Sequence, residues 1–198
     1  MLMQKWKLLD SEFVVNHRWC RVRRDRVELP SGEVVDDFFL NVRPDIALVL
    51  AITPDGEIIF VRQYRHGVGE ILLELPAGAF EPEVEEAEAA AKREFEEETG
   101  YCVDRLNKIA TLYDNPVKDT NRVHLFLAED VTYSGERQLD RTEEIEVVLV
   151  PISEVPGKLR SGEICVAGTI AALLLVLSAR FSTPLLDREM EHFKFAMD

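Results

Sequence analysis

The sequence predicts an α/β fold, in which a mixed β-sheet carries helices on both faces (an α/β/α sandwich) and follows a small antiparallel β region. Three observations predict it. Residues 1–43 contain short strand-like segments around the turn signal Leu29–Gly32. From Asp45 onward, apolar strand-like runs alternate with turns and with helical patterns. Among these runs, Ile46–Ile52 is almost continuously apolar, as expected of a strand buried on both faces.

We expect two regions, a β region over residues 1–43 and a main domain over residues 44–198. The strands expected in the first region are Trp6–Leu9, Phe13–Val15, Trp19–Leu29 and Val34–Leu40. The strands expected in the second are Ile46–Ile52, Glu57–Tyr64, Ile71–Leu75, Leu106–Leu112, Arg122–Ala128 and Ile145–Val150. Helices are expected at Val84–Thr99, Ser153–Arg160 and Val166–Arg180.

Length, charge and cysteine content limit the class of protein. The 198 residues suit one domain with a small addition. A formal net charge of −14 at pH 7 argues against binding to a nucleic-acid backbone. The longest apolar run, Ala167–Leu177, is too short to cross a membrane. Cys20, Cys102 and Cys165 have no paired spacing, so we expect reduced, buried thiols in a cytoplasmic protein.

The helix expected at Val84–Thr99 carries more acidic residues than an ordinary surface helix needs. Carboxylates are disfavoured in the last turn of a helix, yet Glu96–Glu98 fill that turn. The apolar stripe formed by Val84, Ala87, Ala91 and Phe95 continues into Glu94 and Glu98, because seven residues make nearly two helical turns. An inward carboxylate is unfavourable unless it is paired or bound to a metal.

These carboxylates have two readings, a solvated acidic face or a site for a hard divalent cation with oxygen ligands. Glu94 and Glu98 lie one turn apart and converge on one place. Glu97 lies close enough to join as a ligand or to orient a water, and Arg93 can hold it at the i, i+4 spacing.

The spacing of these residues resembles the Nudix box. The stretch Arg93–Tyr101, with Glu85 eight residues before Arg93, matches its pattern of charged and apolar positions. Six residues separate Gly78 from Glu85 where the box has five, and this insertion before the helix leaves the role of Glu85 open. The resemblance implies a Nudix (MutT-like) fold. It also implies hydrolysis of a pyrophosphate with Mg²⁺, or Mn²⁺, bound by Glu94, Glu98 and Glu97.

The resemblance extends to the ADP-ribose pyrophosphatases, through Val61–Arg65, Glu74–Gly78, Arg122–Ala128 and Pro116, which stands sixteen residues after Gly100. It implies that the backbone carbonyl of Ala77 completes the metal shell. It also implies that Arg65 and Arg62 bind phosphate, with Arg65 favoured because it matches the phosphate-binding arginine of the subfamily. The alternative is that one of the two is an exposed strand residue. Glu74 is expected to bind substrate or to pair with an arginine.

The catalytic carboxylate of that subfamily comes from a loop before the last strand, which here is Asp140–Ile145. Glu143 best matches the position that binds metal or activates water, and Glu144 competes with it because the register of the loop is open. A plain solvated turn is the alternative. Glu97 is the further candidate for orienting the water.

The function that this resemblance implies is metal-dependent hydrolysis of a nucleoside diphosphate sugar, with ADP-ribose giving AMP and ribose 5-phosphate. The loop Asn115–Asn121 departs from the Ser-Pro-Gly type of these enzymes, so GDP-mannose or a UDP-sugar is the alternative substrate. A non-catalytic sensor of nucleotide sugars is the alternative from another class. Residues 1–43 resemble a β domain that swaps between subunits, so a homodimer is expected.

Overall fold

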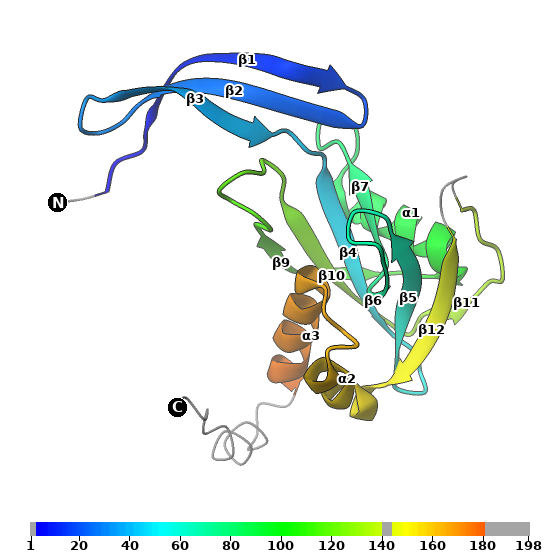
Figure 1. Ribbon diagram of the computed structural model, residues 1–198. Helices are drawn as coiled ribbons and strands as arrows, with labels where there is room; N and C mark the ends of the chain where they lie inside the picture. The colour runs from blue at the N-terminus through cyan, green and yellow to red at the C-terminus, as the bar shows by residue number, and fades with distance from the viewer. Residues whose placement is uncertain (1–2, 140–143, 181–198) are drawn as a thin grey trace, which may run out of the picture.

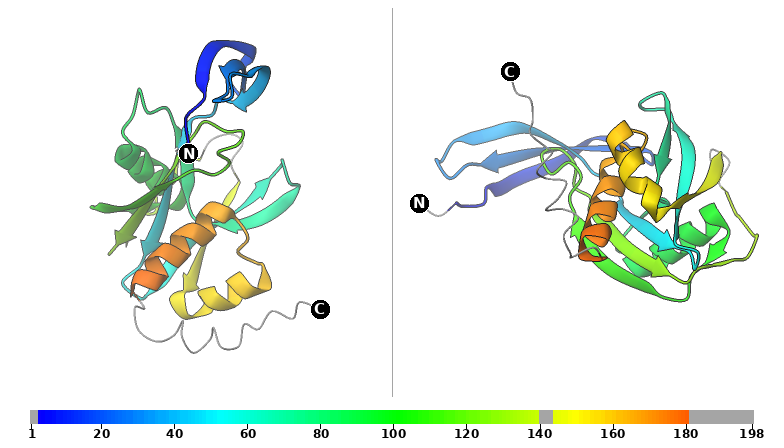
Figure 2. Two further views of the ribbon diagram at one scale, coloured as in Figure 1. Left: turned by 90° about the vertical axis from the view of Figure 1, so that its left-hand side faces the viewer. Right: turned by 90° about the horizontal axis from the view of Figure 1, so that it is seen from below.

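The computed structural model describes residues 3–139 and 144–180. The first strands form a three-stranded antiparallel sheet in the order β1-β2-β3, which lies apart from the rest of the molecule (Figures 1 and 2). These strands are β1 (Lys7–His17), β2 (Cys20–Glu28) and β3 (Val34–Asn41). The two short segments expected before residue 16 are therefore a single strand, with register shifts at Leu8/Asp10 and at Phe13/Val15.

The second sheet is mixed, as the sequence predicts, and has the order β12-β5-β4-β10-β9, with β6 paired to β5 and β7 to β4. Only the β4–β10 pairing is parallel among the pairs described in this sheet. Its strands are β4 (Asp45–Ile52), β5 (Glu57–Arg65), β6 (Glu70–Glu74), β7 (Ala77–Phe80), β9 (Leu106–Leu112), β10 (Val123–Glu129) and β12 (Ile145–Pro151). A two-stranded sheet pairs β8 (Tyr101–Cys102) with β11 (Thr132–Tyr133).

Helices cover both faces of this sheet (Figures 1 and 2). One face carries α1 (Ala87–Thr99), and the other carries α3 (Ala167–Arg180) and the shorter α2 (Val155–Ser161), which follows the 3-10 turn η1 (Ile152–Glu154). Each face has its own apolar cluster, and β4 supplies residues alternately to both. The expected burial of this strand on both faces is thereby confirmed. Within the described ranges, no helix is long and apolar enough to span a membrane.

The sheet divides into two arms beside α1. β4 and β5 pair with each other only at Ile52 and Ile58. Beyond that point, β4 pairs with β7 and β5 pairs with β6, so the two strands diverge (Figure 1). The β4–β7 pair forms one arm of the sheet, and the β5–β6 pair forms the other. A pocket lined from both arms occupies this divergence, and it is described below.

The N-terminal sheet is attached to the main sheet through the loop between β9 and β10. Asp119 in this loop accepts hydrogen bonds from Asn41 Nδ2 at 2.7 Å and from Arg43 Nη1 at 3.2 Å. The Asn41 backbone N–H also donates to the carbonyl of Lys118 at 2.7 Å. The loop therefore continues the edge of β3.

Two expectations about local structure are wrong. Helix α1 begins at Ala87 rather than at Val84, because the backbone at Glu86 is extended and the N–H groups of Val84 and Glu85 close a turn on the Glu81 carbonyl. Val84 is 85% exposed and takes no part in the apolar stripe. The three cysteines are exposed rather than buried, and none forms a disulfide.

Candidate active site

Helix α1 sets the positions of the acidic side chains. Ala90, Ala91 and Phe95 are fully buried against the sheet. Gly100 has a φ of 72° and donates its N–H to the carbonyl of Glu96, which ends the helix in the left-handed conformation that glycine adopts without strain. The helix is thus fixed at its last turn, where the carboxylates lie.

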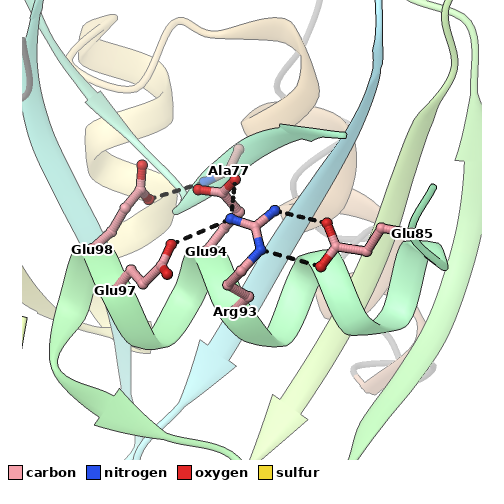
Figure 3. Close-up of polar contacts among 6 residues, drawn as sticks. All are labelled: Ala77, Glu85, Arg93, Glu94, Glu97 and Glu98. Carbon is pink, nitrogen blue, oxygen red and sulfur yellow. Dashed lines mark hydrogen bonds and ion pairs between the residues drawn. The ribbon is translucent and has the colours of Figure 1, made fainter. Parts of the chain in front are cut away.

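The Arg93 guanidinium lies among three carboxylates (Figure 3). Two of its nitrogens bind Glu85, with Nε to Oε1 at 3.1 Å and Nη2 to Oε2 at 2.8 Å. Nη1 donates to Glu94 Oε1 at 2.7 Å and to Glu97 Oε2 at 3.2 Å. The expected pairing of Arg93 with Glu97 is confirmed. Because the hydrogen bond from Arg93 favours the charged form, it holds the pKa of Glu85 below its ordinary value.

Glu98, in the last turn of α1, points toward strand β7. Its side chain is buried, and its Oε2 accepts the backbone N–H of Ala77 at 3.2 Å (Figure 3). The next residue, Gly78, contacts the Glu94 side chain so closely that a Cβ at Gly78 would lie 1.9 Å from Glu94 Cδ. A glycine is therefore required here to leave room for the carboxylate.

A pocket of about 700 Å³ lies between α1, the two arms of the sheet and the start of α3. Glu94, Glu98 and Ala77 line it from one side. From the β5–β6 arm come Arg65 and Glu74, which are joined by hydrogen bonds of 2.7 and 3.4 Å. The further polar and aromatic side chains in the lining are Trp19, Arg43, Gln63, Asp114 and Thr169.

The pocket gathers many of the residues that the sequence singles out: Arg65, Glu74, Ala77, Glu94 and Glu98. Glu97 instead lines a separate cavity of about 470 Å³ on the outer side of α1, together with Arg93. Arg62 does not line the pocket, and its Nη1 binds Glu146 at 2.7 Å. The catalytic and binding roles of all these residues stay predictions.

The predicted catalytic loop is only partly described. Glu143 lies outside the described residues, and Glu144 is exposed just before β12. The sequence does not assign Arg43 or Gln63 to the site. It offers Trp19 only as one of three rings, with Phe39 and Tyr64, that could stack on a nucleobase or pack in the core. For Gln63 a signal existed, because residues two apart in a strand share a face and Gln63 stands two residues before Arg65. Trp19 and Arg43 come from or beside the N-terminal sheet, and only the fold brings them to the pocket.

The acidic residues suit a divalent cation, although they are not drawn together around one. Over residues 3–139 and 144–180, no three His, Cys, Asp or Glu side chains form a group arranged to hold a metal. Arg93 draws Glu94 and Glu97 to itself, and Glu98 turns to the Ala77 N–H. The donor atoms are hard carboxylate oxygens, as Mg²⁺ prefers. The Glu94 side chain occupies the space that a Cβ at Gly78 would fill, so the chain admits a carboxylate beside the β7 backbone, and the donor set fits the cation.

Comparison with known proteins identifies the family. Residues 42–167 match the model of the NUDIX domain, and residues 6–41 match that of the nucleoside diphosphate sugar hydrolase N-terminal domain. An ADP-ribose pyrophosphatase of Bacillus subtilis (strain 168) is 38% identical over 148 residues, which cover 74% of this chain and 79% of that protein. A GDP-mannose pyrophosphatase of Cronobacter sakazakii is 35% identical over 135 residues, which cover 64% of this chain and 70% of that protein.

The fold agrees with these matches. It is similar to the crystal structure of an ADP compounds hydrolase, with a TM-score of 0.79 over 90% of this chain and 96% of that chain, at 24% sequence identity. The chain therefore belongs to the Nudix family. It is a Nudix pyrophosphatase, and within the family it belongs to the group of ADP-ribose and nucleoside diphosphate sugar pyrophosphatases. The expected family and fold class are confirmed.

The pair between Arg93 and Glu85 predicts a stability difference that depends on pH. Glu85→Gln is expected to lower the free energy of unfolding at pH 7 by about 0.2–1 kcal/mol, as for exposed ion pairs. The folded-state pKa of Glu85 lies below the ordinary 4.5, so its contribution is complete above 4.5 and is lost as the pH falls through the lower value. Urea unfolding of both proteins from pH 7 down to pH 3 measures it.

Glu83→Gln, at an exposed carboxylate in the same turn, serves as the control and is expected to show no such loss. A destabilisation by Glu85→Gln that stays constant over the whole pH range would contradict the ion pair as its cause.

Proposed function

We propose that this protein hydrolyses the pyrophosphate bond of a nucleoside diphosphate sugar, with ADP-ribose as the favoured substrate and AMP and ribose 5-phosphate as products. Water forms a new bond to one phosphorus, while the bond from that phosphorus to the bridging oxygen breaks. The observation that carries the proposal is a single pocket that joins an arginine–carboxylate pair to two helix carboxylates. These residues are Arg65, Glu74, Glu94 and Glu98.

The helix carboxylates are proposed to hold a divalent cation, Mg²⁺ or Mn²⁺. Glu94 and Glu98 would bind it with the backbone carbonyl of Ala77, and Glu97 would join them or orient a water. When bound, the cation supplies positive charge against the pyrophosphate and activates water. Arg93 Nη1 binds both Glu94, which lines the pocket, and Glu97, which lines the separate cavity, and this shared partner supports their action as a unit.

Arg65 is proposed to bind the diphosphate, since its planar guanidinium presents paired donors to phosphate oxygens. Its partner Glu74 is 8% exposed and keeps the guanidinium directed into the pocket. Trp19 is proposed to stack on the nucleobase. Trp19 is 78% exposed although it lines the pocket, and the Arg18 guanidinium lies over its ring at 4.4 Å from the centroid. The other face of the ring is the one proposed to stack on the base. Arg62 remains a weaker candidate for a phosphate contact, because it already pairs with Glu146.

Glu143 is proposed to take the proton from the attacking water, with Glu144 as the competing residue. The register of β12 supports this placement. Ile145 pairs with Gln63 of β5, and Gln63 stands two residues from the proposed phosphate-binding Arg65. Ile145, the first residue of β12, therefore lies at the end of β5 that carries Arg65.

The substrate is tested by product analysis. The purified protein with Mg²⁺ is given ADP-ribose, GDP-mannose, UDP-glucose, diadenosine polyphosphates and nucleoside triphosphates. Release of AMP and ribose 5-phosphate from ADP-ribose faster than any other turnover supports the proposal. Faster hydrolysis of GDP-mannose or of a UDP-sugar would favour the alternative, which a similar GDP-mannose pyrophosphatase also supports.

Glu98→Gln is expected to reduce hydrolysis at least about 100-fold, because a catalytic metal supplies several kcal/mol of transition-state stabilisation. The matched control is Glu96→Gln in the same helical turn. Glu96 binds the Val103 N–H and pairs with Lys92, outside the pocket, so its replacement is expected to leave the rate within about threefold of wild type, like an ordinary surface change.

Steady-state rates and a circular dichroism spectrum of each variant are the measurements. Equal rates for Glu98→Gln and wild type would contradict the metal role of Glu98. Binding of a nucleotide sugar without turnover in any divalent metal would instead favour the sensor alternative.

We also propose that the protein is a homodimer, joined through the N-terminal sheet. Large apolar side chains are exposed on and around β1, and β1 is an edge strand of its sheet. They include Trp6, Leu8, Phe13 and Val15, with exposed fractions from 43% to 56%. A second copy of the same sheet has the apolar surface needed to cover them.

Phe13→Asp is expected to weaken the dimer at least about tenfold, since apolar anchors at the centre of an interface each contribute more than 1 kcal/mol. Light scattering after gel filtration over a range of concentrations measures the dissociation. Glu12→Gln, at the neighbouring exposed position, is the control. A variant lacking residues 1–43 that remained a soluble dimer would contradict the proposal.

A further inference from the structure

Gln63 carries a buried oxygen that lacks a hydrogen-bond donor. Its side chain is 7% exposed, and its Oε1 has no partner within the described parts of the chain. It lies on the same face of β5 as Arg65, two residues away, and both side chains line the pocket. A buried carbonyl oxygen without a donor is unfavourable. The oxygen is itself covered, so a ligand that brings a donor gains binding energy when the amide turns its oxygen toward the pocket.

The charged donors of the pocket are already engaged by carboxylates. Arg65 binds Glu74 at 2.7 Å, and Arg43 binds Asp119 at 3.2 Å. A diphosphate offers acceptor oxygens rather than donors at neutral pH, so it does not satisfy a carboxamide oxygen. Sugar hydroxyls do, since each has one O–H donor.

The two arms of the sheet indicate which part of a nucleotide sugar reaches Gln63. Trp19 and Arg43 line the pocket from the side of the N-terminal sheet and the β4–β7 arm. Gln63 and Arg65 line it from the β5–β6 arm. A base on Trp19 and a diphosphate at Arg65 would leave the β5–β6 side of the pocket, with Gln63, for the sugar on the far phosphate.

We propose that Gln63 determines specificity for the sugar half of the substrate, through a hydrogen bond that its Oε1 accepts from a sugar hydroxyl. This inference rests on the proposed function, because it requires a nucleoside diphosphate sugar in the pocket. It assigns to Gln63 no part in metal binding or in the chemical step.

The test compares two ligands that differ only by the sugar. Gln63→Met is made in the Glu98→Gln protein, which is expected to bind without turnover, and calorimetry measures the affinities for ADP-ribose and for ADP. Methionine keeps the length of the side chain and removes the acceptor. Affinity for ADP-ribose is expected to fall roughly 3- to 30-fold, while affinity for ADP stays unchanged. Gln138→Met, the same change at an exposed glutamine outside this pocket, is expected to alter neither.

A second readout separates binding from folding. The thermal unfolding midpoint of Gln63→Met is expected to equal or exceed that of its parent, because the variant no longer buries an unsatisfied oxygen. In the otherwise wild-type protein, the KM for ADP-ribose is expected to rise, with a smaller change in kcat.

Equal losses of ADP-ribose and ADP affinity, or no loss of either, would overturn the role of Gln63 and leave the proposed function standing. A parent protein that binds neither ligand, together with a wild-type protein that hydrolyses no nucleotide sugar, would overturn both.

Discussion

The contact on which the site depends is the one between the Arg93 guanidinium and the carboxylates of Glu85, Glu94 and Glu97. These three carboxylates and that of Glu98, on a chain of net charge −14, would repel one another, and Glu97 and Glu98 in the last turn also oppose the helix dipole. Arg93 offsets three of them, and the backbone N–H of Ala77 satisfies the fourth, Glu98. The charges of these carboxylates are therefore offset within the protein itself, and binding of a cation would require Glu94 and Glu98 to turn from these partners toward it.

The pocket arises from the way in which the sheet divides. Because β4 and β5 pair only at Ile52 and Ile58, each strand is free to take a second partner, β7 or β6. β7 brings Ala77 and Gly78 against α1, while β6 brings Glu74 to Arg65. The division of the sheet thus places the backbone of β7 against the carboxylates of α1, and places Arg65 across the pocket from them.

The sequence predicts the parts of the site that depend on local spacing. Helical periodicity and the Nudix box predict the carboxylates, and the buried run of β4 predicts the centre of the sheet. The sequence does not predict where α1 starts, because an extended backbone at Glu86 and a turn closed on the Glu81 carbonyl replace the expected first helical turn. The sequence also predicts a phosphate contact for Arg62. In the structure, side chains alternate between the two faces of β5, and Arg62 forms an ion pair with Glu146 instead. Trp19 reaches the pocket through tertiary contacts alone, which no local pattern encodes.

The central claim is that the carboxylates of α1 and the backbone of β7 form a divalent-metal site that hydrolyses a nucleotide sugar. The most direct measurement is the rate of AMP release from ADP-ribose by protein treated with EDTA and then titrated with Mg²⁺. The account predicts no turnover after EDTA and a saturable return of activity with Mg²⁺. Turnover that continues undiminished without divalent metal, or that fails to appear with any of them, would contradict it.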